Sequence, residues 1–306
     1  MQTAHTVRGI RETVRAHGVV EQMLDYGFAT LPSNMPAQFP PIARDFGRLA
    51  RDEREQEYWR VTEAREINPR EDPEVDIGIL WKRERQKKWT VSALERAEGR
   101  THYDKKTTLH FAPRLLAYLS ESGAARDEYE EMLKGLGEAH SFGEHLSLVL
   151  AEEFERFLPE HSFVRRVIEA GFWSKTRIVR YNEFDGNANF HRDRCFLTVH
   201  IQSSRPGLYL QGRNGEIVRA NETNPAQVTV FPGFKFDVVT GGRYDGTIHG
   251  VAERGIDLLT EARQTLVYFC QCSVSNREWR DASRRLAEEP RYRISQEACF
   301  AEAIRT

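Results

Sequence analysis

His191 and Asp193 are separated by one residue in the sequence His191-Arg192-Asp193. Residues i and i+2 of a strand point to the same face, so this imidazole and this carboxylate can converge on one point. A second imidazole comes from His249, inside an apolar run at residues 247–251. Singly, a histidine beside an aspartate is common on surfaces, and a histidine in an apolar strand is usually a core residue. Together, two histidines and one carboxylate match the ligand set of non-haem Fe(II) oxygenases, which leaves adjacent metal positions open.

Arg263 and Thr265 form a second i, i+2 pair, in the triplet Arg263-Gln264-Thr265. On one strand face, a guanidinium and a hydroxyl can bind a carboxylate from two directions. Taken alone, the triplet fits a strand-edge arginine in a surface ion pair more readily. Its interpretation as an anion site therefore depends on the rest of the chain.

The elements that must position these residues change type near residue 176. Eight short β-rich runs with period 2 follow, separated by turn residues such as Asn214-Gly215 and Pro232-Gly233. The runs span residues 177–181, 196–202, 207–211, 216–220, 227–231, 236–240, 247–252 and 263–274. Short strands at this spacing predict an antiparallel sandwich or barrel.

Before residue 176 the apolar residues recur with a period near 3.6, which predicts helices. We expect helices at residues 9–26 and 42–59, one long helix at 126–158 or two helices joined near residues 135–143, and, after the β core, helices at residues 276–287 and near the C-terminus. Residues 62–113 are the least regular part and include a basic run at 82–88, which is typical of a solvated loop. The chain is expected to be α+β, with a mainly β core and helices packed outside it. We expect a single catalytic domain, residues 1–306, made of a helical region (1–175), a β core (176–275) and C-terminal helices (276–306).

Charge and composition exclude several classes of protein. The chain has 44 basic and 46 acidic side chains and a formal net charge of −2, whereas a dedicated nucleic-acid binder carries a basic excess. No apolar run approaches the roughly 18 residues that span a bilayer, and the first residues lack the apolar stretch of a signal peptide. Four cysteines are too few for a disulfide framework and suit a reducing compartment. We therefore expect a cytoplasmic protein with no nucleic-acid or membrane partner.

Six short motifs follow one another between Tyr181 and Phe269. They are HRDRCFLT at 191–198, GLYL at 207–210, FPG at 231–233, VVTGGRY at 238–244, HGV at 249–251 and RQTLVYF at 263–269. In order and spacing, this segment resembles the catalytic core of the iron- and 2-oxoglutarate-dependent oxygenases, in the branch named after isopenicillin N synthase. The resemblance implies a double-stranded β-helix, the jelly-roll fold that cupins also have.

The same resemblance implies roles for six residues. Fe(II) would be bound by His191, Asp193 and His249. The distal carboxylate of 2-oxoglutarate would be held by Arg263 and Thr265, and Tyr181 would also reach this co-substrate. Thr265 stands where serine is commoner in the family, which keeps the hydroxyl.

An enzyme of this kind uses O₂ and 2-oxoglutarate to oxidise an unactivated C–H bond by hydroxylation, desaturation or cyclisation, and it releases succinate. Asp193 argues against halogenation, because halogenating relatives lack the carboxylate ligand. Charged and hydroxyl side chains at residues 102–108 fit a small substrate that is polar or amino-acid-like. Two alternatives stay open: an iron oxidase whose substrate itself binds iron without 2-oxoglutarate, and a non-catalytic binding protein on the same β core. The sequence predicts no oligomeric state.

Overall fold

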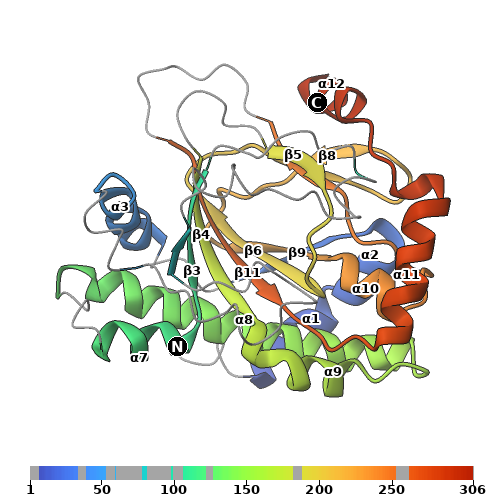
Figure 1. Cartoon of the computed structure of the whole chain (residues 1–306), viewed down its shortest axis with the longest axis horizontal. Helices are drawn as coiled ribbons and strands as arrows, with labels where there is room; N and C mark the ends of the chain where they lie inside the picture. The colour runs from blue at the N-terminus through green and yellow to red at the C-terminus, as the bar shows by residue number, and fades with distance from the viewer. Residues whose placement is uncertain are drawn as a thin grey trace.

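The structure is a computed structural model that describes residues 7–33, 39–52, 59, 78–80, 98, 106–121, 127–181, 188–252 and 262–305. In chain order its strands are β1 (Ala29–Pro32), β2 (Gly78–Leu80), β3 (Lys106–Phe111), β4 (Lys175–Tyr181), β5 (Ala188–His191), β6 (Leu197–Ser203), β7 (Leu208–Gln211), β8 (Ile217–Arg219), β9 (Gln227–Pro232), β10 (His249–Val251) and β11 (Gln264–Cys270). Two antiparallel sheets face each other, as Figure 1 shows. The larger sheet has the order β1-β9-β6-β11-β4-β3-β2, and the smaller has the order β5-β10-β7-β8. The predicted antiparallel sandwich is thus present.

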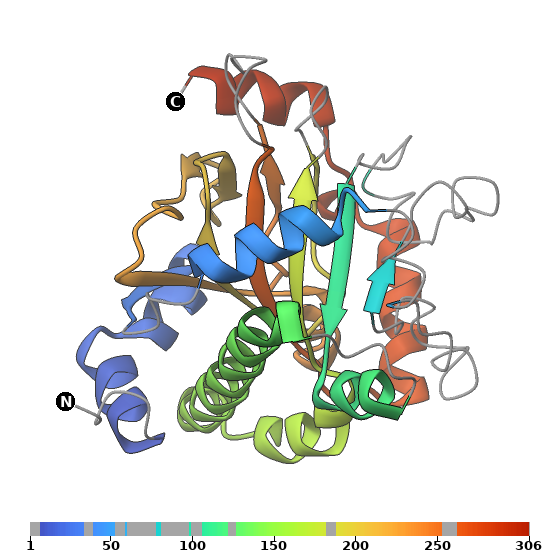
Figure 2. The same ribbon diagram turned by 90° about the vertical axis from the view of Figure 1, so that its left-hand side faces the viewer.

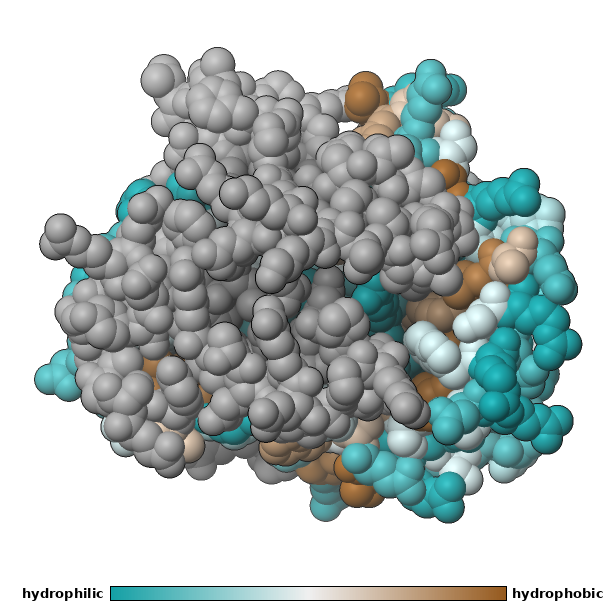
Figure 3. All heavy atoms as spheres, in the orientation of Figure 1, coloured by the Kyte–Doolittle hydropathy of each residue, from teal (hydrophilic) through white to brown (hydrophobic). Residues whose placement is uncertain are grey.

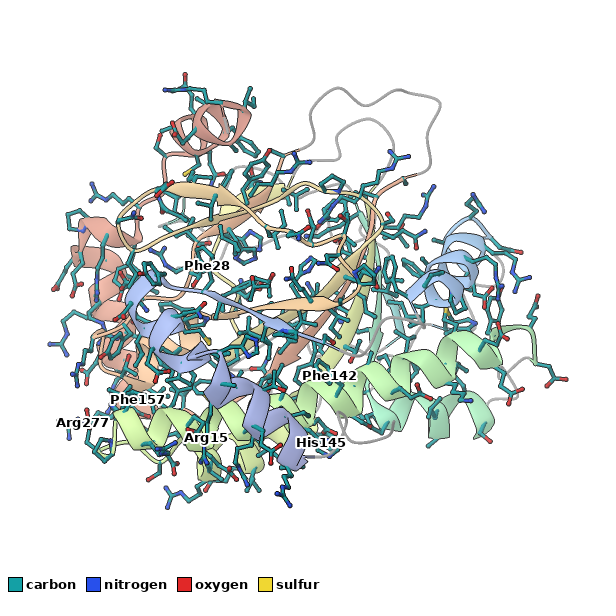
Figure 4. The ribbon with its side chains drawn as sticks, turned by 180° about the vertical axis from the view of Figure 1, so that it is seen from behind. Arg15, Phe28, Phe142, His145, Phe157 and Arg277 are labelled. Atoms are coloured by element: carbon teal, nitrogen blue, oxygen red, sulfur yellow. The ribbon has the colours of Figure 1, made fainter. Side chains whose placement is uncertain are left out.

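Helices cover the outer faces of both sheets. They are α1 (Val7–Ala16), α2 (Val19–Tyr26), α3 (Phe39–Leu49), α7 (Pro113–Glu121), α8 (Glu130–Phe157), α9 (Phe163–Ala170), α10 (Phe234–Val239), α11 (Asn276–Glu288) and α12 (Gln296–Arg305). The long helix α8 packs along the larger sheet (Figure 2) and contributes Leu146, Leu150 and Phe154 to the main core. On the far side of α8 lies α1, whose Arg15 pairs with Glu153 at 2.7 Å (Figure 4). On the smaller sheet, α12 packs against β5 and β8.

The helix α11 lies at the surface and buries only Ala282. Hydrophilic side chains cover its region of the molecule in Figure 3. Ala282 lies in a small apolar cluster with Phe234 and Val238 of α10 and with Tyr292. The helix therefore covers one end of the β core through a small apolar contact.

Seven of the eight predicted strands are present, and the strand predicted at residues 236–240 is wrong. Those residues lie in or directly after α10, all six of whose residues are buried. Lys235 and Asp237 are buried like their apolar neighbours, and they alternate with Phe234, Phe236 and Val238, so this helix shows the period 2 that is typical of a strand. Gly233 precedes this helix, and a Cβ there would overlap the backbone of Asp193 and Cys195. The backbone N–H of Phe234 donates to the carbonyl of Asp193 at 2.6 Å, which fixes α10 beside a predicted metal ligand.

Four strands lie outside the eight predicted runs, namely β1, β2, β3 and β5. β1 contains Pro32 but lies at the edge of its sheet, where a missing N–H costs no ladder hydrogen bond. β3 pairs along its whole length with β4, from Lys106 opposite Tyr181 to Phe111 opposite Thr176. Part of the region expected to be irregular therefore extends the larger sheet. The basic run at residues 82–88 lies outside the described residues.

The helices agree with the prediction except at their ends and at one break. The helix expected at residues 9–26 is divided into α1 and α2 at Gly18, whose φ of 54° ends the first helix. The helix expected at 42–59 is α3, which begins earlier, at Phe39, and ends at Leu49. The segment 126–158, predicted as one helix or two, forms a short 3₁₀ turn followed by the continuous α8. Both C-terminal helices are confirmed.

Gly143 stands in the middle of α8 because Tyr268 of β11 packs directly on it. A Cβ at this position would overlap the tyrosine ring. We expect Gly143→Ala to lower the free energy of unfolding by about 1–3 kcal/mol, as overpacking of a core does. The measurement is chemical denaturation. Gly137→Ala in the same helix is the control, since its Cβ would meet only Phe111 at 3.8 Å, and it should be neutral or stabilising; equal losses in both variants would contradict the packing explanation.

No helix among the described residues is long and apolar enough to cross a membrane. The four cysteines, Cys195, Cys270, Cys272 and Cys299, are buried free thiols.

Candidate active site

His191, Asp193 and His249 meet between the two sheets. His191 ends β5, and His249 begins β10 directly opposite it in the antiparallel pair. One ligand atom from each of the three residues lies within 4.8 Å of the others. The Nε2 atom of His191 is 3.5 Å from Asp193 Oδ1, and that of His249 is 3.3 Å from Asp193 Oδ2. Asp193 lies two residues beyond β5, so the cluster forms by cross-strand pairing and a loop rather than along one strand face.

Backbone carbonyls orient both imidazoles. The Nδ1 atom of His191 lies 2.6 Å from the carbonyl oxygen of Asn189, and that of His249 lies 3.2 Å from the carbonyl oxygen of Thr247. A neutral imidazole that donates from Nδ1 leaves the lone pair of Nε2 free to bind a metal. Both Nε2 atoms turn toward Asp193. Two imidazole nitrogens and one carboxylate in this arrangement fit a divalent iron ion with open positions.

Asp193 is held as an anion. Burial alone would raise the pKa of this carboxyl, but the adjacent imidazoles of His249 and His191 and a hydrogen bond from Thr198 keep it well below its usual range. Thr198 Oγ1 donates to Asp193 Oδ2 at 2.7 Å. Burial and the nearby Asp193 raise the pKa of the Cys195 thiol far above its usual value. Cys195 therefore stays protonated at neutral pH, and no thiolate competes for the metal.

Thr198 is a residue whose role the sequence did not indicate. Thr198→Val keeps the shape but removes the hydroxyl that orients Asp193. Loss of such an outer hydrogen bond typically weakens metal binding by about 10–100-fold, and we expect the low end of that range here. The measurement is anaerobic Fe(II) binding in competition with a chelator. Thr229→Val, at a buried threonine of β9, is the control; a similar loss in that variant would mean that the hydrogen bond is not the cause.

All six residues singled out from the sequence line one cavity between the sheets. Arg263 and Tyr181 lie at one end, where the guanidinium carbon is 5.0 Å from the centre of the tyrosine ring. Thr265 Oγ1 is 2.8 Å from Ser203 Oγ, which also accepts a hydrogen bond from Arg263 at 3.0 Å. Apolar side chains line the wall between this end and the histidines, among them Leu208, Phe231, Val267 and Phe269. The cavity thus has a cationic end and a metal-binding end.

Several residues of the site were not foreseen. Arg263 forms a buried ion pair with Glu222, and the side chains of both are almost fully inaccessible. Glu222 lies in a polar stretch between β8 and β9 that reads as an exposed turn, so no local signal indicated it. The cavity is also lined by Lys106, Arg177 and His200. Of these, His200 follows Thr198 by two residues on β6, and period-2 alternation could have identified it as facing the same way.

Residues 173–271 match the family model of the 2OG-Fe(II) oxygenase superfamily. This segment is therefore identified as a domain of the 2OG-Fe(II) oxygenase superfamily. The matched segment contains all six residues described above. Among curated proteins, none matches this oxygenase.

Solved structures with the same fold include a protein from Shewanella oneidensis described as an oxygenase, with 17% identity and a TM-score of 0.59 over 90% of this chain and 94% of the other. The dioxygenase for auxin oxidation of rice shares 17% identity, with a TM-score of 0.58 over 96% and 94% of the two chains. Its Arabidopsis thaliana counterpart, in a complex with 2-oxoglutarate, shares 15%, with a TM-score of 0.55 over 86% and 90%. At these identities the likeness concerns the fold.

The predicted superfamily and the double-stranded β-helix are therefore confirmed. The oxygenase is an Fe(II)- and 2-oxoglutarate-dependent dioxygenase, and these two are its cofactor and co-substrate. The branch named after isopenicillin N synthase is not distinguished from the rest of the superfamily and stays a prediction.

Proposed function

We propose that this oxygenase oxidises an unactivated C–H bond of a small polar molecule, with decarboxylation of 2-oxoglutarate to succinate. One observation carries the proposal: His191, Asp193 and His249 share a cavity with Arg263, Thr265 and Tyr181. One end of the cavity has the ligands of Fe(II), and the other has donors for a carboxylate. A 2-oxo acid with a distal carboxylate fits both ends, because its 2-oxo acid group can bind the metal and its distal carboxylate can accept hydrogen bonds from the donors.

We assign different roles to the residues of the cavity. His191, Asp193 and His249 hold Fe(II), which when bound supplies the activation of O₂ that is coupled to loss of CO₂ from 2-oxoglutarate. Arg263 and Thr265 donate hydrogen bonds to the distal carboxylate, and Tyr181 limits how far it can move. Phe231 and Val267 keep water from the space between the two ends. Because Asp193 occupies a metal position, we propose hydroxylation, desaturation or cyclisation rather than halogenation.

Arg177 is our candidate for the residue that binds the substrate. Its guanidinium carbon lies 4.6 Å from the centre of the Phe269 ring. Phe269 is the cross-strand partner of Thr198, and Thr198 binds Asp193. Arg177 therefore lies toward the metal-binding end of the cavity, whereas Arg263 lies at the opposite end with Tyr181. A cation there suits a polar or amino-acid-like substrate that carries a carboxylate.

We expect Arg177→Leu to raise the KM of a carboxylate-bearing substrate by at least about tenfold, because one charge-assisted pair is lost. Binding of 2-oxoglutarate should be unchanged. Arg180→Leu, on the other face of β4, is the matched control and should affect neither. A change in 2-oxoglutarate binding in Arg177→Leu would place this arginine at the co-substrate instead.

The decisive experiment is an anaerobic titration of the Fe(II) protein with 2-oxoglutarate, followed by a screen of small acids and amino acids for stimulated succinate release. We expect a metal-to-ligand charge-transfer band and a substrate that increases succinate. Turnover without 2-oxoglutarate would favour the oxidase in which substrate itself binds iron. Failure to bind iron would favour a non-catalytic binding protein.

We further propose that residues 1–306 act as one catalytic unit, because α1, α3 and α9 pack on α8, which itself packs on the larger sheet. A reducing, cytoplasmic location stays a prediction from cysteine usage.

A further inference from the structure

We infer that Glu222 is a built-in competitor of the co-substrate: its carboxylate accepts from Nη2 of Arg263 and engages Thr265 through Ser203, and it thereby lowers the affinity for 2-oxoglutarate. The inference rests on the proposed function of Arg263 and Thr265. Glu222 lies between β8 and β9, outside the motifs of the family, and its side chain is completely buried.

The contacts of Glu222 leave it little freedom. One carboxylate oxygen, Oε1, accepts a hydrogen bond from the backbone N–H of Leu208. The other, Oε2, accepts from Arg263 Nη2 and from Ser203 Oγ, the latter at 2.8 Å. The backbone N–H of Ser203 also donates to the carbonyl of Glu222 at 2.9 Å. Three hydrogen bonds to the carboxylate and one to the backbone carbonyl therefore fix Glu222 beside the guanidinium.

Thr265 is engaged by the same carboxylate through Ser203. A serine hydroxyl has one proton to donate, and that of Ser203 is directed to Glu222. In the 2.8 Å contact between Ser203 Oγ and Thr265 Oγ1, the donor is therefore Thr265. Both groups that we assign to the distal carboxylate, Arg263 and Thr265, thus already donate toward Glu222, directly or through one hydroxyl.

The imidazole beside Glu222 adds no second positive charge. His200 Nε2 lies 3.5 Å from Oε2, but burial lowers the pKa of His200 to about 4, so this imidazole is neutral at pH 7. Burial alone would raise the pKa of Glu222, but Arg263 and the hydrogen-bond donors hold it below its usual value. A distal carboxylate that enters this end of the cavity therefore meets a guanidinium whose Nη2 is already paired, beside a second anion in a poorly screened environment.

Glu222→Gln removes the negative charge of this side chain but keeps its size and shape. The amide oxygen can accept from Leu208 N–H while the amide nitrogen donates to Ser203 Oγ, which releases Thr265 and leaves Arg263 without its carboxylate. We expect 2-oxoglutarate to bind at least about tenfold more tightly to this variant, because repulsion is removed and the guanidinium gains its missing partner. Glu222→Asp keeps the charge but withdraws it by one methylene, and a smaller gain of about threefold is expected.

The measurement is the dissociation constant of 2-oxoglutarate for the anaerobic Fe(II) protein, from the charge-transfer band and from calorimetry. 2-Oxovalerate, which has the same chain without a distal carboxylate, is the control ligand and should bind wild type and both variants equally. Glu216→Gln, an exposed glutamate in the neighbouring hairpin, should match wild type. If Glu222→Gln does not fold, the sign of the change in Glu222→Asp decides.

The outcomes are distinct. Tighter 2-oxoglutarate binding with unchanged 2-oxovalerate binding supports a competitor. Weaker 2-oxoglutarate binding in either variant would overturn the inference and make Glu222 a support that merely holds Arg263 in place. Equal gains for both ligands would also overturn it, since the effect would not depend on the distal carboxylate. Wild-type protein that binds iron but not 2-oxoglutarate would overturn the proposed function itself, and this inference with it.

Discussion

Replacement of His191, Asp193 or His249 by alanine is expected to abolish both iron binding and 2-oxoglutarate turnover. Each residue supplies one of three ligand atoms that lie within 4.8 Å of one another, and two ligands hold Fe(II) far less tightly than three. The fold should survive, because a chain of this length buries roughly 75% of its surface and needs no metal for stability. The measurements are iron content after anaerobic reconstitution, succinate release and circular dichroism.

Matched replacements elsewhere provide the controls for this prediction. His17→Ala removes an exposed histidine of the loop between α1 and α2, and Asp281→Ala removes a partly exposed aspartate of α11. Both should bind iron as wild type does. Full activity in a folded variant of any of the three ligand residues would refute the ligand assignment.

Arg263→Ala is expected to weaken 2-oxoglutarate binding by about 100- to 1000-fold while Fe(II) binding changes little. Hydrogen bonds to charged groups contribute about 1.5–3 kcal/mol each, and the variant loses more than one. The variant also leaves Glu222 as a buried anion without its partner, which destabilises a protein by about 3–5 kcal/mol. Binding is measured by the charge-transfer band, and the folded fraction by circular dichroism under the same conditions.

Two milder variants keep this prediction testable if Arg263→Ala unfolds. Arg263→Lys preserves a cation opposite Glu222 but loses the planar fork, so it should fold and still lose at least about tenfold in 2-oxoglutarate affinity. Thr265→Val loses one neutral hydroxyl and should cost roughly tenfold. Wild-type affinity in both variants would mean that the distal carboxylate binds elsewhere in the cavity.

The ligand set could be predicted from the sequence because its signals are local. His191 and Asp193 are close in the chain, and His249 and Arg263 each lie in short motifs of a known family. The expectation that His191 and Asp193 share one face of a strand is only partly correct, because His191 ends β5 and Asp193 lies in the following loop. The residues converge because β5 pairs with β10, which the sequence does not specify.

Other parts of the molecule could not be predicted, for physical reasons. The charged residues of α10, Lys235 and Asp237, are buried like its apolar ones, so the alternation of the two kinds predicts a strand although the segment is a helix. Gly143 looked like a possible break in a helix, yet it is a contact surface for Tyr268. Glu222 follows a polar turn, and it is buried only because Ser203, Leu208 and Arg263 surround it in the folded chain.

The two sheets each supply one half of the site. His191 and His249 belong to the smaller sheet, whereas Thr265 belongs to the larger one, with Arg263 directly before it. Sheets packed face to face lie about 10 Å apart, a separation that core packing fixes. A diacid that is held at both ends must fit this distance. The separation of the sheets therefore selects the number of carbon atoms between the two acid groups. Oxaloacetate is one methylene shorter than 2-oxoglutarate and 2-oxoadipate is one methylene longer, with the same charges. We expect neither acid to bind well, even after the exchange of a single polar residue.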